Sequence, residues 1–169
     1  PPTPHGPGDV NGDGGTDLLW QNRANGRVAV WYMSGPVHIR NAAILPDQVA
    51  DTAWHIVGTG DGKREGQMDL YWQHQTTGEL AIWFMFDTVR VSAELLTPAA
   101  VPDTSWKVRT VTDLDADGYP DLIWQHTSSG DVAVWFMTGT RKRSGELLAP
   151  AQVSDLDWKI VGAGDVDRD

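Results

Sequence analysis

The chain contains no cysteine among its 169 residues, so disulfides cannot stabilise its fold. It also lacks long apolar runs: stretches such as residues 81–86 are far too short to span a bilayer, which argues against membrane insertion. Positive charge is scarce, and a formal net charge of −10 argues against nucleic acid and anionic membrane surfaces as partners. No window shows a sustained helical period with caps, so we expect almost no α-helix.

Catalytic motifs are missing as well. No nucleophile elbow, phosphate-binding loop or zinc-protease motif occurs. Carboxylates are abundant, but more than half of them fall in the acidic loops described below, which leaves little support for hydrolysis by paired carboxylates. We therefore expect that the chain is not an enzyme.

What the sequence has instead is an internal repeat of 52 residues. Fixed self-similarity at such a period is typical of stacked-repeat proteins. Three tryptophan series and one glutamine series carry it: Trp20, Trp72 and Trp124; Trp31, Trp83 and Trp135; Trp54, Trp106 and Trp158; and Gln21, Gln73 and Gln125.

One period reads as four short strands, because runs of β-branched and aromatic residues alternate with Gly, Pro, Asn and Asp. In the second period we predict strands at residues 54–59, 69–74, 79–86 and 89–96. A loop with Pro98 and Pro102 then returns to Trp106.

The third strands, VAVWYM, ELAIWFMF and DVAVWFM, are apolar at almost every position. A strand with one solvated face would alternate, so this pattern indicates burial of both faces. Radially stacked four-stranded sheets provide such burial, and a unit of this length matches known propeller blades. We therefore predict an all-β fold, a β-propeller built from 52-residue four-stranded antiparallel blades, with three blades' worth of strands in this chain.

The repeat frame also predicts the domain organisation. Residues 1–8 form a Pro/Gly-rich N-terminal segment, 9–53 a blade that lacks its first strand, 54–105 and 106–157 two complete blades, and 158–169 the first strand of a next blade with the start of its calcium loop. Two explanations of this incomplete set stay open. The chain is a segment of a propeller with six to eight blades, or copies associate and each donates its spare strand to the incomplete blade of the next.

An acidic loop of nine residues recurs with the repeat, as DVNGDGGTD at 9–17 and DLDADGYPD at 113–121. Carboxylate or amide oxygens stand at loop positions one, three, five and nine, and the backbone carbonyl at position seven can supply another. Such hard oxygen ligands suit Ca²⁺, and no His or Cys cluster has zinc spacing. An EF-hand is excluded, because position twelve is Trp20 or Trp124 rather than Glu.

Two further copies of this loop are degenerate. At 61–69, Lys63 replaces the ligand at position three, so we expect a weak or empty site with Asp61, Glu65 and Asp69, where the Lys63 ammonium stands in for the ion. The fourth copy offers Asp165, Asp167 and Asp169.

These loops, with the following Leu/Ile and Trp, give the chain a resemblance over residues 6–169 to FG-GAP or VCBS-type repeats, the calcium-binding propeller blades related to those of integrin α-subunits. In that family the loop joins the first two strands of a blade and ligates Ca²⁺. The resemblance implies one site from Asp9, Asn11, Asp13, the Gly15 carbonyl and Asp17, and another from Asp113, Asp115, Asp117, the Tyr119 carbonyl and Asp121.

The remaining conspicuous side chains have simpler interpretations. Trp20, Trp31 and their equivalents lie inside apolar strands, so we expect them to pack between blades. Trp54, Trp106 and Trp158 begin strands beside loops, which makes them candidates for a glycan-binding edge. We expect His74 and His126 to make hydrogen bonds at a strand end, and the basic run 141–143 to be solvated.

Taken together, the sequence predicts a non-catalytic, calcium-stabilised propeller module for recognition of glycans or an extracellular protein. The resemblance implies a secreted or cell-surface location. Two alternatives are a lectin with sites at blade edges, and a structural unit that self-associates into a ring or fibre by strand exchange.

Overall fold

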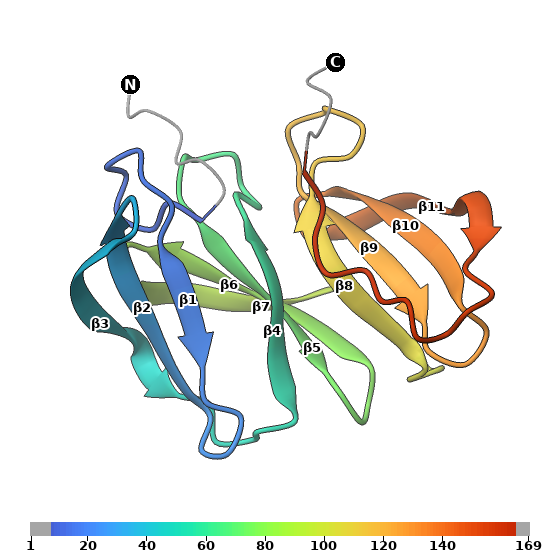
Figure 1. Cartoon of the computed structure of the whole chain (residues 1–169), viewed down its shortest axis with the longest axis horizontal. Helices are drawn as coiled ribbons and strands as arrows, with labels where there is room; N and C mark the ends of the chain where they lie inside the picture. The colour runs from blue at the N-terminus through green and yellow to red at the C-terminus, as the bar shows by residue number, and fades with distance from the viewer. Residues whose placement is uncertain (1–7, 165–169) are drawn as a thin grey trace.

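The computed structural model describes residues 8–164, which form an all-β structure without α-helix (Figure 1). This confirms the predicted class. The eleven strands are β1 (Leu18–Gln21), β2 (Arg27–Ser34), β3 (Val37–Gln48), β4 (Trp54–Gly60), β5 (Asp69–His74), β6 (Glu79–Phe86), β7 (Val89–Ala100), β8 (Trp106–Thr112), β9 (Asp121–His126), β10 (Asp131–Thr138) and β11 (Arg141–Gln152). Within this part of the chain no helix is long and apolar enough to cross a membrane.

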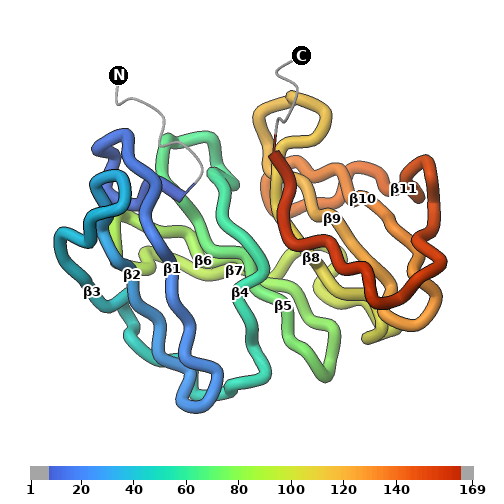
Figure 2. Tube along the Cα trace, in the orientation of Figure 1, coloured from blue at the N-terminus to red at the C-terminus, as the bar shows by residue number. Residues whose placement is uncertain are grey.

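The strands pair antiparallel in three consecutive units. The first unit comprises β1–β3, the middle unit β4–β7 and the third unit β8–β11. Single parallel bridges, Leu45 with Val89 and Thr97 with Arg141, join β3 to β7 and β7 to β11. The result is one mixed eleven-stranded sheet that is not closed, and the trace in Figure 2 follows the three units in chain order.

The strand boundaries agree closely with the repeat, with one correction. The expected loop at Pro98 is wrong, because β7 continues to Ala100. Proline lacks an amide hydrogen, so it is tolerated only where no ladder bond is needed from that position. A register shift between Glu79 and Ala81 lets β6 and β7 resume pairing beyond it.

Two apolar cores lie where the units meet. In the first core, Val28, Val30 and Tyr32 of β2 pack with β5 and β6 residues such as Leu70 and Met85. In the second, the opposite face of the middle unit packs on the third unit; its members are Tyr71, Leu80, Ile82, Phe84, Leu96, Val108, Leu122, Trp124 and Met137. The middle unit is therefore covered on both faces.

The first unit is covered on one face only. β6 is buried along nearly its whole length, whereas β2 alternates between buried and exposed positions. Trp20 is 46% exposed, whereas its equivalents Trp72 and Trp124 are 2% and 1% exposed. Trp31 is 39% exposed, whereas its equivalent Trp83 is 8% exposed. The expectation that Trp20 and Trp31 pack between blades is wrong in this chain, because no unit within residues 8–164 covers that face.

A repeated glutamine connects each unit to the next. Gln73 on β5 donates its side-chain N–H to the carbonyl of Trp106 (2.9 Å) and accepts the amide of Val108 (3.0 Å). The same two bonds run from Gln21 to Trp54 and Ile56, and from Gln125 to Trp158 and Ile160. The side-chain amide thus satisfies two backbone groups of the following strand, as a neighbouring strand would.

Candidate functional site

The aspartate at loop position nine holds each acidic loop against the sheet. Both carboxylate oxygens of Asp69 accept backbone amides, from Gly62 at 2.9 Å and from Met85 of β6 at 2.9 Å. The equivalent bonds are made by Asp17 and Asp121. All three side chains are buried, because the loop folds back over the start of the second strand.

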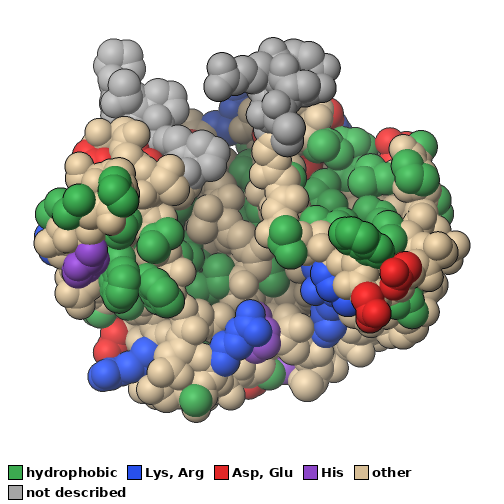
Figure 3. All heavy atoms as spheres, in the orientation of Figure 1, with side chains coloured by type: hydrophobic (Ala, Val, Ile, Leu, Met, Phe, Trp, Pro, Cys, Tyr) green, Lys and Arg blue, Asp and Glu red, His purple; other side chains and the backbone are tan. Residues whose placement is uncertain are grey.

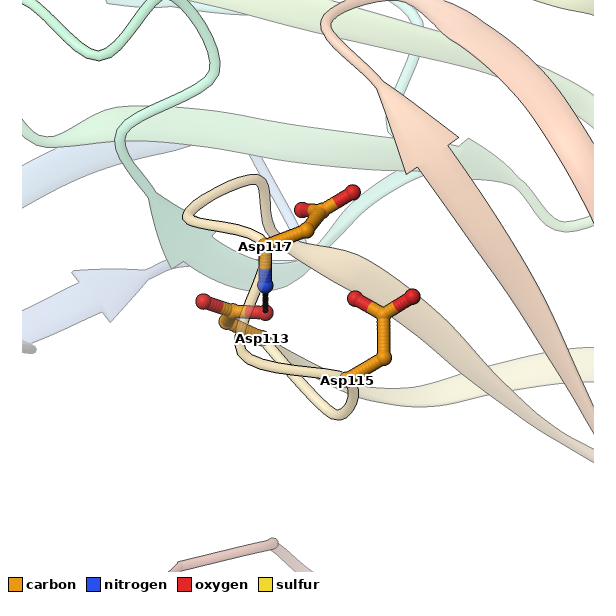
Figure 4. A group of neighbouring side chains, drawn as sticks. All are labelled: Asp113, Asp115 and Asp117. Atoms are coloured by element: carbon orange, nitrogen blue, oxygen red, sulfur yellow. Dashed lines mark hydrogen bonds between the residues drawn. The ribbon is translucent and has the colours of Figure 1, made fainter.

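Only one loop within residues 8–164 brings three carboxylates together. Asp113, Asp115 and Asp117 each place an oxygen within 4.8 Å of the other two (Figure 4). The turn is shaped by Asp113, which accepts the amides of Asp117 (3.1 Å) and Gly118 (2.8 Å). These exposed, convergent oxygens fit a hard cation such as Ca²⁺. Asp121, predicted as a fourth carboxylate ligand, lies outside the group.

A basic side chain already neutralises part of this cluster. Arg143 at the start of β11 donates to Asp117 at 2.8 Å and forms an ion pair with Asp115. The prediction that the run 141–143 is only solvated is therefore wrong for Arg143. This contact brings together residues 26 and 28 positions apart, and the sequence gives no local signal for it.

Loop 9–17 repeats part of this arrangement, and within residues 8–164 no ion pair involves its aspartates. Asp9 accepts the amides of Gly12 (2.7 Å) and Gly14 (3.0 Å), and Asn11 donates its side-chain amide to Asp13 (3.0 Å). The position equivalent to Arg143 is Ile39. Gly15 and Tyr119, whose carbonyls are the predicted metal ligands at position seven, donate their backbone amides to the aspartates at position five. The distances are 2.8 Å from Gly15 to Asp13 and 2.8 Å from Tyr119 to Asp117.

Loop 61–69 keeps the fold of the loop but loses the ligand cluster. Asp61 accepts the amides of Glu65 and Gly66, as Asp113 does in its loop, while Glu65 itself is exposed. The Lys63 ammonium lies 3.6 Å from the ring centroid of Phe84. The expectation that this ammonium replaces the ion is therefore wrong, because the aromatic face holds it instead.

Burial and hydrogen bonding set the carboxyl pKa values of these loops in opposite directions. Burial raises the pKa of Asp69 to about 7, against the opposing effect of its two backbone hydrogen bonds. Burial also raises the pKa of Asp121. The amide of Gly15 and the side chain of Asn11 lower the pKa of Asp13. The exposed aspartate is thus stabilised as an anion, whereas the buried ones resist ionisation.

Two equivalent cavities occur beside the tryptophans. One, of about 160 Å³, is lined by Val49, Trp54, Trp72, Ala81 and Trp83. The other, of about 260 Å³, is lined by Val101, Trp106, Trp124, Ala133 and Trp135, which are the same positions one period later. Both are smaller than the roughly 300–1,000 Å³ of drug-sized pockets, so each has room for about one small ring.

One tryptophan of each cavity has a buried indole N–H without a partner among the described residues. The indole N–H groups of Trp72 and Trp124 are buried and have no hydrogen-bond partner. Their rings pair with Trp83 and Trp135 at centroid distances of 4.6 and 4.8 Å. A buried donor without a partner is costly, so these two indoles are held in place at the expense of one hydrogen bond each.

The other predicted residues are accounted for as follows. His74 and His126 make the expected bonds, to Asp51 (2.9 Å) and Asp103 (3.0 Å). Trp54 and Trp106 are half-buried, and Trp158 is 70% exposed and belongs to neither cavity. The aspartates of the fourth loop, Asp165, Asp167 and Asp169, lie outside the described residues.

Comparison with known proteins finds no matching family model, no matching curated protein and no matching solved structure.

Proposed function

We propose that this chain is a non-catalytic, calcium-binding β-propeller repeat module that acts in extracellular recognition. The observation that carries the proposal is the convergence of Asp113, Asp115 and Asp117 in one exposed turn. The resemblance of the repeat to FG-GAP and VCBS-type sequences supports it, as does the equivalent turn at 9–17. When bound, Ca²⁺ would cross-link a loop whose like charges otherwise repel.

The propeller assignment rests on the way the units stack. Two complete four-stranded units pack face to face, and the middle one is covered on both sides. Glutamine links repeat at the same interval, so each unit fixes the first strand of the next. A ring of such units is the arrangement in which every unit would have two covered faces.

The resemblance to extracellular repeat proteins supports the extracellular location, and a calcium site of low affinity would suit it. A turn with three carboxylates, two of them on exposed residues and one half-buried, suits the weak affinities of extracellular modules, with Kd on the order of 10⁻⁴–10⁻³ M. Free calcium in that range is needed to fill such a site.

Thermal unfolding with calcium and with chelator tests the metal. Because the ion binds only the folded state, saturating calcium should raise the melting temperature. The free energy of unfolding should increase by roughly 3 kcal/mol when free calcium is a hundredfold above Kd. Asp115→Asn should reduce this gain, whereas Asp157→Asn, an exposed aspartate outside the loops, should not. An unchanged midpoint in the parent protein would remove calcium from the account.

Arg143 offers a second variant for the same site. Since its guanidinium competes for Asp115 and Asp117, Arg143→Ala should increase calcium affinity at this loop. Arg141→Ala, two residues away on the same strand, is the matched control. Equal calcium affinities in both variants would contradict binding at Asp115 and Asp117.

The second candidate function is glycan binding at the tryptophan cavities, and a specific observation favours it. Each cavity has three tryptophans in its lining, one of which (Trp54 or Trp106) is half-buried, and aromatic rings of this kind pack against sugar rings. Two equivalent sites per chain would give such a lectin multivalent binding.

A glycan array with the parent protein and three variants tests this function. Trp54→Ala and Trp106→Ala each remove one wall of one cavity and should weaken binding to any recognised glycan. Phe86→Ala is the control, because Phe86 is a 66% exposed aromatic residue that lines neither cavity. An array without signal for the calcium-loaded parent would contradict the lectin function and leave the calcium site to be judged by the melting experiment.

A further inference from the structure

One strand edge of the first unit is open. Within residues 8–164, β1 pairs only with β2, whereas β5 and β9 are paired on both sides. In the middle unit the corresponding edge is covered by β4, from Trp54 opposite His74 to Gly60 opposite Asp69. An open edge presents unpaired amides and carbonyls to any strand of matching sequence.

The segment that matches this edge lies at the other end of the described chain. Residues 158–164, WKIVGAG, follow the sequences of β4 (WHIVGTG) and β8 (WKVRTVT) in the same repeat frame. They are held by Gln125 as β4 and β8 are held by Gln21 and Gln73. Yet they pair with no strand within the described part of the chain, and Val161 is 95% exposed.

Within the described part of the chain, the apolar face beside the open edge also lacks a cover. Leu18 is 43% exposed, while its equivalents Leu70 and Leu122 are 0% and 1% exposed. Trp20 and Trp31 lie on the same face. Figure 3 shows hydrophobic side chains gathered over β1 and β2 on one lobe and beside the C-terminal segment on the other.

We propose that two copies of this chain associate head to tail, with residues 158–164 of one copy adding as a strand to β1 of the other. Contacts already present between units of the chain indicate a second copy as the occupant of this edge. The chain twice packs this kind of face on the preceding unit, and it twice pairs a strand of this sequence with the edge equivalent to β1. A second copy can make the same face-to-face packing and the same strand pairing with surfaces that the chain already uses between its own units. This association does not depend on calcium binding.

The repeat fixes the register of the added strand. By equivalence with β4 and β5, Trp158 lies opposite Asn22, Lys159 opposite Gln21 and Ala163 opposite Leu18 of the partner. Because Ile160 donates its amide to Gln125, the amide of Lys159 points to the opposite side, where β1 would accept it. If both copies donate, the assembly contains six four-stranded units, which is within the range of about four to eight known for propellers.

Solution mass by light scattering, measured with calcium and with chelator, tests association. The proposal predicts twice the chain mass of 18.5 kDa in both conditions. Lys159→Pro removes the amide that β1 needs and should shift the mass towards the monomer, while Lys159→Ala keeps that amide and should not. A monomer at all concentrations, or a dimer unaffected by Lys159→Pro, would overturn strand addition.

Cross-linking tests the register directly, because the chain has no cysteine of its own. Leu18→Cys and Ala163→Cys are prepared as separate variants, mixed and oxidised. Directly opposite positions of paired strands are close enough for a disulfide, so the mixture should give a covalent dimer. Mixing Leu18→Cys with a Gly139→Cys variant, altered in a hairpin turn away from the edge, serves as the control. Equal cross-linking in both mixtures would contradict the register.

Discussion

The first and middle units have the same sequence pattern but different surroundings, and the difference shows what burial contributes. Trp72, Trp83 and Leu70 in the middle unit are almost fully buried, because the first unit packs on the face that carries them. Trp20, Trp31 and Leu18 occupy the same positions in the first unit and remain exposed. The tryptophan pair keeps its geometry in both, at 4.6 and 4.7 Å between ring centroids. The tryptophan pair is therefore formed within each unit, whereas its burial depends on a neighbouring unit.

The largest expected difference between the two units concerns these tryptophans. Trp72→Ala should cost about 4 kcal/mol, because a buried indole is replaced by a cavity. Trp20→Ala should cost about 1 kcal/mol, because half of this indole is already in contact with water. Chemical denaturation of both variants at low protein concentration, where association is weak, measures the difference. Equal losses would contradict the comparison.

The buried carboxyl of Asp69 gives the next largest effect, through pH. Its folded pKa of about 7 lies above the ordinary value of 3.8, so the folded state binds more protons between these pH values. In chelator, stability should therefore fall as pH rises from about 4 to about 7, by up to about 4 kcal/mol from this group, and then level off.

Unfolding curves for the parent and for Asp69→Asn across this pH range check the point. The variant should be less stable at low pH, because its amide can accept only one of the two backbone bonds. Its pH slope should also be shallower. Identical slopes in the two proteins would show that Asp69 titrates at its ordinary pKa.

The glutamine links should show a smaller contrast between units. Gln73→Ala leaves the carbonyl of Trp106 and the amide of Val108 without partners in a buried place, at a cost of about 2 kcal/mol. Gln21→Ala should cost about 1 kcal/mol, since Gln21 is only half-buried and water can replace it. Denaturation midpoints measure both, and a larger loss for Gln21→Ala would reverse the expected order.

The smallest predicted effect is a gain in the middle unit. Lys63→Asp restores a carboxylate at loop position three, beside Asp61 and Glu65, and should add a weak calcium response worth about 1 kcal/mol or less. It also removes the contact of the Lys63 ammonium with Phe84. Lys63→Ala separates the two effects, because it loses that contact without adding a ligand. If Lys63→Asp and Lys63→Ala respond equally to calcium, a carboxylate at position 63 does not restore calcium binding to loop 61–69.

The fold was largely predictable because the repeat shows each strand three times. Strands at 69–74 and 79–86 were expected at the residues where they occur, and β4 extends one residue beyond its prediction. What could not be predicted is the exposure of Trp20, because it depends on a unit that the described residues do not contain. The extension of β7 past Pro98 depends on an irregularity in β7 itself, where five residue steps from Leu95 to Ala100 lie opposite two steps of β6, and the sequence did not predict it.

The candidate site was predicted in part. The aspartates at positions one, three and five of loop 113–121 come together as expected, since alternate residues of a tight turn share one side. Asp121 lies apart, because backbone amides from its own loop and from β10 take both of its oxygens. Arg143 was missed, since a long-range ion pair has no fixed spacing. Of the tryptophan cavities, the sequence predicted only that Trp54 and Trp106 lie at an edge. It did not predict the other residues that line each cavity.

Counting bound ions tests the central claim most directly. Isothermal titration of the chelator-treated chain with calcium should give two ions per chain, one at 9–17 and one at 113–121, and the Asp115→Asn, Asp117→Asn double variant should retain one. A titration without binding heat, confirmed by equilibrium dialysis with labelled calcium that shows no uptake, would contradict the claim that these loops are calcium sites.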